Sequence, residues 1–219
     1  MIMDYFWLLD PGHGGLVKGR YFTPGKRSPV LDDGRQLFEG EFNRAIADRI
    51  KASCAQEGLR CFDLVNTHFD ISLNERVDLA NFLHAQYSQD NPPRRCVYLS
   101  IHANAFVPAG QSLGFNNAQG WEVFTSKGET ASDAMATQFL KAMEGEFPHA
   151  RFRKDFSDDD PDKEVNFFVL RKTAMPAVLT ENFFMTHRDE VELLLSEEGR
   201  DRIARAHFEA MKKIEALQL

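Results

Sequence analysis

The sequence contains little cysteine, and its cysteines form no metal-binding pattern. Cys54, Cys61 and Cys96 are the only three, an odd number at spacings that match no zinc motif. This excludes a zinc site built on cysteine thiolates. We expect all three to be reduced thiols in the protein interior, where free cysteine is most often found.

Long apolar runs and clusters of basic residues are also missing. No stretch approaches the ~20 apolar residues of a membrane-spanning helix, so no membrane span is expected. The net charge is −7 and no candidate helix carries a Lys/Arg cluster, so we expect no nucleic-acid partner. The apolar run at residues 5–9 is short and follows no basic segment, so we interpret it as a strand; no signal peptide is visible in these residues, and the export route stays open.

No internal repeat and no Gly/Ser-rich linker interrupts the 219 residues. A chain of this length buries roughly 70% of its unfolded surface on folding, so it forms a sizeable core without disulfides. We therefore expect one domain over residues 1–219. Predicted strands alternate with predicted helices, which favours an α/β fold. The expected architecture is a twisted, mostly parallel sheet flanked by helices on both faces, of the phosphorylase/hydrolase-like type.

Apolar patterns and turn residues define the expected elements. Ser72-Leu73-Asn74-Glu75 has the form of a capping box, and Thr186 is expected to cap a later helix. Apolar runs predict strands at 6–9, 59–65, 96–101, 120–125, 167–170 and 177–180. Helical spacing of apolar residues predicts helices at 42–54, 73–83, 132–145, 189–195 and from 196 onward.

Two histidines and two glutamates each stand in a short and unusual motif. Two His and one Glu are a sufficient protein ligand set for a catalytic zinc with an open fourth position, and a second Glu can act as a base. The set therefore predicts a zinc hydrolase. The four residues are His13 in the motif at 10–15, Glu39 at 38–43, His102 at 100–105 and Glu181 at 179–183.

Three of these residues follow predicted strands. His13, His102 and Glu181 come directly after apolar runs, and sites in α/β proteins form at the carboxyl ends of parallel strands. Each has a structural alternative: a turn histidine, a buried structural histidine, or a buried glutamate. The last alternative requires an ion-pair partner for Glu181, such as Arg76 or Arg171, because an unpaired buried carboxylate is costly.

Glu39 lies at the start of a predicted helix, where a carboxylate is favourable to the helix dipole. Glu41 competes with it for the same functional role. Facing favours Glu39, which precedes the core-facing Phe42 by one turn. The remaining histidines lack such contexts and are expected on the surface or on helices; they are His68, His84, His149, His187 and His207.

In their order along the chain, these motifs resemble the type-3 family of zinc-dependent N-acetylmuramoyl-L-alanine amidases, which includes cell-division amidases and phage endolysins. The likeness covers nearly the whole chain. The resemblance implies that His13, Glu39 and His102 bind a catalytic Zn²⁺ and that Glu181 is the catalytic glutamate. The matching segments are 9–15, Glu39 with Asn43 and Ala47, 72–76 with 80–81, 100–105, 120–123, 169–171 and 176–181.

The resemblance further implies hydrolysis of the amide bond between N-acetylmuramic acid and L-alanine in peptidoglycan. Peptidoglycan or its muropeptide fragments would be the substrate, and the cell wall, periplasmic or extracellular, the place of action, as for an autolysin or endolysin. A monomer is favoured. Two alternatives stay open: a zinc peptidase acting on peptidoglycan stem peptides, and a catalytically silent peptidoglycan-binding module.

The sequence departs from the family pattern at a few places. Asn182 stands where the family usually has Gly, and Thr186-His187 replaces a common Asn. None of these positions is an expected ligand, so the departures bear on substrate fit.

A further departure is the acidic segment, residues 151–166, which is longer and more acidic than the resemblance leads us to expect. We expect a solvated loop there, either a tolerated insertion or a rim of the substrate groove. In the second case Arg151, Arg153 and Lys154 would meet stem-peptide carboxylates while the aspartates stay in solvent.

Overall fold

The structure is a computed structural model, and it describes residues 4–90, 94–157 and 159–219. Six strands form one mixed sheet in the order β4-β1-β5-β8-β6-β7. The central strands are parallel, whereas β6 runs antiparallel to β8 and β7 runs parallel to β6. The strands are β1 (Asp4–Pro11), β4 (Cys61–Asp63), β5 (Arg94–Asn104), β6 (Glu122–Thr125), β7 (Lys163–Glu164) and β8 (Ala177–Phe184), with β2 (Leu16–Val17) and β3 (Arg20–Tyr21) forming a separate hairpin.

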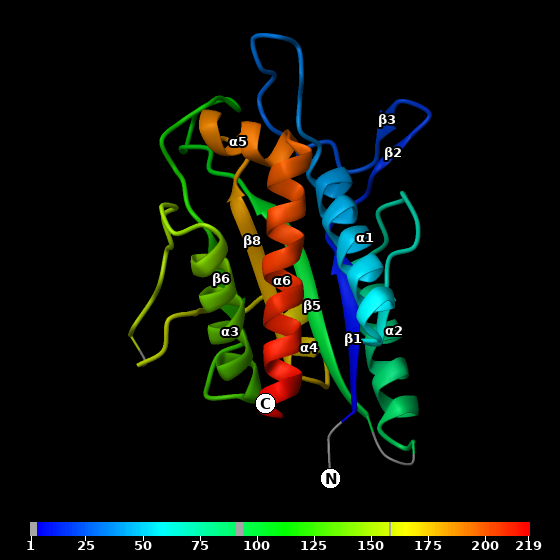
Figure 1. The fold of residues 1–219 in the computed structure, drawn as a ribbon. Helices are drawn as coiled ribbons and strands as arrows, with labels where there is room; N and C mark the ends of the chain where they lie inside the picture. Colours follow the sequence, from blue (N-terminus) through cyan, green and yellow to red (C-terminus); the bar gives the residue numbers. More distant parts are fainter. Residues whose placement is uncertain (1–3, 91–93, 158) are drawn as a thin grey trace.

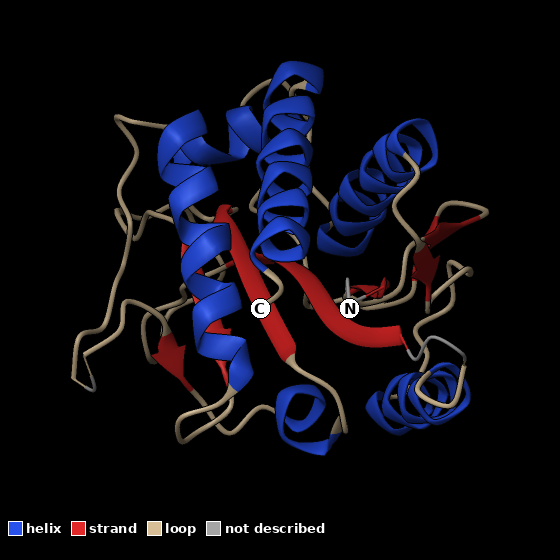
Figure 2. Cartoon of the chain, turned by 60° about the horizontal axis from the view of Figure 1, so that its bottom comes forward, coloured by secondary structure: helices blue, strands red, loops and turns tan. Residues whose placement is uncertain are grey.

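Helices cover both faces of the sheet, as the sequence predicts (Figures 1 and 2). One face packs against α1, α3 and α6, and the other against α2 and α4. The described helices are α1 (Glu39–Glu57), α2 (Leu73–Tyr87), α3 (Ala131–Glu146), α4 (Phe168–Lys172), α5 (Arg188–Leu195) and α6 (Glu197–Leu217). The predicted α/β fold class, with a mostly parallel sheet between two helical layers, is therefore confirmed.

Strand β1 shows why the core divides into two layers. Trp7 and Leu9 pack with α1 and α6, whereas Phe6 and Leu8 pack with α2 and α4. Successive side chains of a strand point to opposite faces, and both faces of a parallel sheet are covered, so the whole run is apolar. The two layers fix β1 and β5 firmly, and their carboxyl ends carry candidate site residues.

Helix caps agree with the sequence in one case and differ in another. The capping box at α2 is present: Ser72 Oγ accepts from the Glu75 amide at 3.2 Å, and Glu75 accepts from the Ser72 amide. The prediction that Thr186 caps α5 is wrong. His187 is the N-cap, and its Nδ1 accepts from the amide of Glu190. Thr186 is buried, and its Oγ1 accepts a hydrogen bond from the amide of Phe106, in the chain after β5.

The strand predicted at 167–170 is also wrong, because this segment forms the short helix α4. Val169 and Leu170 are adjacent in sequence and both face the core, which a helix permits and an alternating strand does not. Thr173 Oγ1 donates to the carbonyl of Val169 at 2.8 Å and closes the last turn. A four-residue apolar run cannot separate the two structures by periodicity alone.

The cysteines and the lack of a membrane span follow expectation with one exception. All three cysteines are free, and Cys54 and Cys96 are buried, but Cys61 is only half-buried. Over the ranges that the structure describes, no helix combines the length and apolarity needed to cross a bilayer.

Candidate metal centre

Three of the four predicted site residues come together at the end of the sheet where the central strands β1 and β5 finish. His13 follows β1, Glu39 opens α1, and His102 lies near the end of β5. One potential ligand atom from each lies within 4.8 Å of the other two, so the group could hold a metal ion. These segments are far apart in sequence, and the parallel pairing of β1 with β5 brings them together.

The carboxylate of Glu39 lies between the two imidazoles. Its Oε1 is 3.0 Å from His102 Nδ1 and 3.2 Å from His13 Nε2. The two rings have centroids 4.9 Å apart and are almost perpendicular, at 84°. Burial opposes ionisation of Glu39, but the neighbouring imidazoles of His102 and His13 outweigh it and hold the Glu39 pKa below its usual range. Glu39 is therefore an anion with nitrogen donors on either side.

Several buried polar atoms at this place lack a partner. His13 Nε2, Glu39 Oε2 and Glu181 Oε2 are shielded from solvent and form no hydrogen bond. Buried polar atoms are nearly always satisfied, so such a group needs an explanation. Imidazole nitrogen and carboxylate oxygen are the donors that zinc prefers, and three protein ligands leave a position open. The residues present thus fit a divalent metal of this kind.

Glu181 lies directly across from His102 on the neighbouring strand β8. The prediction that it follows the end of its strand is wrong, because β8 continues to Phe184 past a register irregularity in β5. No ion pair of the described residues includes Glu181, so neither Arg76 nor Arg171 fills that role. Burial raises the pKa of Glu181 to about 8, against the influence of His102 and with the help of Glu39.

Backbone constraints aim the two histidines. A Cβ at Gly12 would lie 2.0 Å from His102 Cε1, so only glycine leaves room for that ring. His13 has a φ of 65°, in the left-handed region that residues with a side chain rarely adopt. The buried Asn43 donates from Nδ2 to the Gly12 carbonyl at 3.0 Å. Strained backbone of this kind is characteristic of functional sites.

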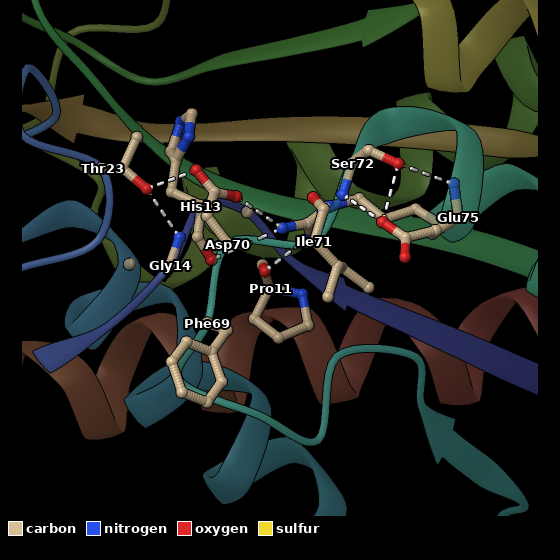
Figure 3. A network of polar contacts seen from close by, with 12 residues as sticks. Pro11, His13, Gly14, Thr23, Phe69, Asp70, Ile71, Ser72 and Glu75 are labelled. Atoms are coloured by element: carbon tan, nitrogen blue, oxygen red, sulfur yellow. Dashed lines mark hydrogen bonds and ion pairs between the residues drawn. The ribbon is translucent and has the colours of Figure 1, made fainter. Parts of the chain in front are cut away.

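The loop before α2 is attached to the loop that carries His13 (Figure 3). Thr23 Oγ1 donates to Asp70 Oδ2 at 2.5 Å and accepts from the Gly14 amide at 2.8 Å. Asp70 also lies 3.4 Å from the guanidinium of Arg76. These bonds join three loops into one wall beside the candidate metal centre.

A buried ion pair, which the sequence analysis missed, lies under this wall. Arg76 pairs with Asp10, and both side chains are 2% exposed. Asp10 Oδ2 also accepts hydrogen bonds from Tyr98 at 2.5 Å and Ser100 at 2.8 Å. Burial works against ionisation of Asp10, but Arg76 and the two hydroxyls outweigh it and lower the Asp10 pKa. The pair fixes the end of β1 from which His13 projects.

The cavity at this edge has a volume of about 720 Å³, which is in the range of small-molecule sites. It is lined by His13, His102 and Glu181 on one side and by apolar residues of the α2 and α4 segments on the other. Lys26 also lines it, and its charge favours the ionised form of Glu181. No local pattern singles out Lys26, which lies in a Pro/Gly-containing loop without periodicity.

The sequence profile of the N-acetylmuramoyl-L-alanine amidase family named Amidase_3 matches residues 8–213. The chain belongs to this family.

Curated relatives with sequence similarity to this amidase-family chain include an amidase and an endolysin. It is 29% identical over 208 residues to the N-acetylmuramoyl-L-alanine amidase CwlM of Bacillus licheniformis, covering 94% of this chain and 66% of that protein. It is 30% identical over 208 residues to the endolysin of Bacillus phage SPP1, covering 94% and 64%. The chain thus spans slightly less than two thirds of the length of these relatives.

Two solved amidase structures share the fold over almost their entire length. The N-acetylmuramoyl-L-alanine amidase AmiC2 of Nostoc punctiforme superposes with a TM-score of 0.72 at 25% identity, covering 98% of each chain. The corresponding amidase of Clostridium difficile 630 gives 0.71 at 26% identity, covering 96% of each chain.

Asn182, the amidase-family departure beside Glu181, has a clear structural role. Its Oδ1 accepts from Trp121 Nε1 at 3.0 Å, and its Nδ2 donates to the His102 carbonyl at 2.9 Å. Glycine at this position would make neither bond. Asn182 therefore ties β8 to β5 and to the residue before β6, next to Glu181.

The structure gives the groove-rim interpretation of residues 151–166 no support. Arg153 pairs with Glu122 of β6, and Lys154 pairs with Glu144 of α3, so both side chains are engaged by carboxylates of the protein itself. None of the segment's described residues lines the cavity. The expectation that its aspartates all stay in solvent also fails, because Asp162 is buried.

Proposed function

We propose that this chain is a zinc-dependent N-acetylmuramoyl-L-alanine amidase acting on peptidoglycan. It would hydrolyse the amide bond that joins the lactyl group of N-acetylmuramic acid to L-alanine. Family membership over residues 8–213 and the amidase and endolysin relatives support the bond and the substrate class. The observation that carries the proposal is the set of unpartnered, buried atoms on His13, Glu39 and Glu181 beside His102.

We assign His13, Glu39 and His102 as the zinc ligands. Two neutral imidazoles and one carboxylate would leave a net charge of +1 at the centre. When bound, zinc supplies Lewis acidity, which polarises a carbonyl oxygen and makes water more acidic. Glu39 Oε1 lies within 3.2 Å of a nitrogen of each histidine, which indicates that the three side chains are already arranged around one point.

Glu181 is the candidate general base and acid. Its Oε2 is buried and unpartnered, and the residue lines the cavity next to His102. We propose that its carboxylate accepts a proton from water as that water attacks the amide carbon. The same carboxyl group then donates the proton to the leaving amine of L-alanine, as a single positioned carboxylate can do in acid–base catalysis.

Substrate binding involves the remaining lining residues. Arg76 is bound to Asp10, whereas Lys26 is the lysine among the residues that line the cavity. We assign Lys26 to the carboxylate groups of the stem peptide. Leu73 and Phe167 are apolar, exposed and at the cavity wall, so they supply contact surface for the substrate.

We further propose that residues 1–219 act as one catalytic domain and that its place of action is the cell wall, in the periplasm or outside the cell. The one-domain proposal rests on the continuous sheet, which uses strands from Asp4 to Phe184. A monomer remains the expectation for its oligomeric state.

The test is digestion of purified muropeptides, with the products identified by mass spectrometry. The expected products are an intact stem peptide with a free N-terminal L-alanine and a sugar that keeps its lactyl carboxylate. Stem peptides without the sugar serve as the control and should stay intact. Cleavage within those peptides would support the zinc-peptidase alternative, and the absence of any cleavage by zinc-loaded protein would support the binding module.

A further inference from the structure

A second group of acidic side chains lies at the other end of the sheet. Asp133 is in the first turn of α3, and Asp160 and Asp162 precede β7; one carboxylate oxygen of each lies within 4.8 Å of the other two. Thr125, the last residue of β6, bonds to Asp162. Strand β6 runs antiparallel to β8, so the carboxyl end of β6 lies at the opposite end of the sheet from His102. The group is therefore separate from the amidase centre.

Asp162 is the member of this group whose carboxylate is shielded from water. Its side chain is buried, with the residue 1% exposed. Thr125 Oγ1 donates to Asp162 Oδ2 at 2.6 Å, but Oδ1 is also buried and has no hydrogen-bond partner. A buried carboxylate with an unpaired oxygen is costly and is normally compensated by a positive charge.

Protein groups do not supply that charge. Among the ion pairs of the described ranges, none includes Asp133, Asp160 or Asp162, and the adjacent Lys163 pairs with Glu122. The amino end of α3 contributes the equivalent of about half a charge, and Asp133 already accepts from the amide of the N-cap Thr130 there. Three neighbouring carboxylates exceed this compensation severalfold.

We propose that Asp133, Asp160 and Asp162 bind one calcium ion. All the donors are carboxylate oxygens, which hard cations prefer, and the absence of nitrogen and sulfur donors argues against zinc here. Calcium takes 6–8 oxygen ligands in flexible arrangements, so water and nearby carbonyl or hydroxyl oxygens can complete the shell. The ion would fasten the acidic segment to the start of α3, and it plays no part in the amidase reaction.

A proton is the competing way to satisfy this group. Burial raises the pKa of Asp162 to about 7, with the Thr125 hydroxyl acting against the rise and Asp160 adding to it. A proton on Asp162 would let that carboxyl group stay buried near pH 7 without a cation. The two explanations differ in their response to calcium, which a proton-filled pair does not require.

To test this, calcium chloride is added to the full zinc-loaded chain in calcium-free buffer. Isothermal titration calorimetry measures the binding, and thermal unfolding measures the change in Tm. We expect about one calcium per chain and a rise in Tm of about 5 °C or more once calcium exceeds its dissociation constant about a hundredfold. Asp160→Asn should weaken calcium binding ~10-fold or more and remove the Tm rise. Asp155→Asn removes an exposed carboxylate of the same segment and should leave both unchanged.

The proposal is overturned if the unaltered chain shows neither heat of binding nor a rise in Tm at millimolar calcium. It is equally overturned if Asp160→Asn binds calcium as tightly as the unaltered chain. Should Asp162→Asn fail to fold, Asp160→Asn and Asp133→Asn still decide, because both residues are only half-buried. Zinc content measured in the same samples keeps the result independent of the amidase centre.

Discussion

His102 and Glu181 are direct partners in the parallel pairing of β5 and β8. The proposed zinc ligand and the proposed base are thus attached to adjacent backbone positions in the middle of the sheet. Their separation is fixed by strand pairing, which deforms less than a loop. Zinc binding and acid–base catalysis should therefore be separable by substitution, because each depends on its own side chain.

His102→Ala should lose most of the zinc, because two remaining ligands hold the ion poorly. Glu181→Gln should keep about one zinc per chain and lose roughly 10²–10⁴-fold in kcat, the usual contribution of a positioned acid–base group. Elemental analysis and muropeptide hydrolysis measure the two effects. His149→Ala changes an exposed histidine and is the control. Full zinc occupancy in both His13→Ala and His102→Ala would refute the ligand assignment.

Removing the catalytic metal should abolish activity without unfolding the chain. The two apolar layers form a core of their own, unlike a zinc finger that folds only with its ion. Chelated protein should keep its far-ultraviolet circular-dichroism spectrum, and added zinc should restore hydrolysis. Calcium is supplied in excess throughout so that only the zinc centre is depleted. Loss of the spectrum under these conditions would mean that zinc also stabilises the fold.

Arg76→Met should be strongly destabilising because it leaves Asp10 buried without its counter-charge. The expected loss is about 3–5 kcal/mol in the free energy of unfolding, measured with urea. Arg188→Met breaks an exposed pair with Asp32 and should cost less than about 1 kcal/mol. If both variants lost the same free energy of unfolding, the buried pair would contribute no more to stability than the exposed one.

Asn182→Ala should destabilise the protein by about 1–3 kcal/mol, because it leaves the buried Trp121 Nε1 and the His102 carbonyl without their partner. The urea midpoint reports the loss. Since the His102 backbone is released, kcat should fall as well while the zinc content stays near one. Asn166→Ala alters an exposed asparagine and provides the reference. An unchanged urea midpoint would show that Asn182 does not stabilise this part of the fold.

Acid should destabilise the fold through His207. Burial lowers its pKa to about 4, although a hydrogen bond to the Ile203 carbonyl opposes this, whereas the unfolded chain has the ordinary value of about 6.5. The unfolded state therefore takes up the proton first as the pH falls. Stability is complete above about pH 6.5 and declines towards pH 4, by at most about 3 kcal/mol for this group.

Urea unfolding at pH 7 and pH 5 measures this decline. His207→Gln, which keeps a polar group near Thr180, should show a smaller difference between the two pH values than the unaltered chain. His149→Gln should not alter the difference. If His207→Gln retained the full decline, other buried groups would account for it.

The candidate site residues can be recognised in the sequence, whereas the residues that hold them in place cannot, because only the first stand in local sequence patterns. His13, His102 and Glu181 each follow an apolar run, and His13 is also flanked by glycines, so a local pattern in the sequence marks each of them. Arg76 and Asp10 meet only through the fold, across 66 positions, and no local pattern reports such a pair. The capping box at α2 was readable because both of its members lie within one turn.

The sequence misleads about two elements, each for its own physical reason. The apolar run at 167–170 is too short for its period to be measured, and packing against α2 and β8 makes it a helix. The end of β8 was placed at Thr180 because the polar Glu181 and Asn182 interrupt the apolar run. Their side chains are satisfied or used by the cleft, so the strand continues through them.

The acidic segment also determines how the sheet ends. Phe152 bridges to Trp121, and Lys163 and Glu164 pair with β6, so this segment covers the open side of an otherwise unprotected edge strand. The resulting edge strand β7 has two residues, both charged, and the opposite edge strand β4 has three. Short and charged edges give another chain little backbone on which to add a strand. The acidic segment thus also protects the sheet against edge-to-edge aggregation.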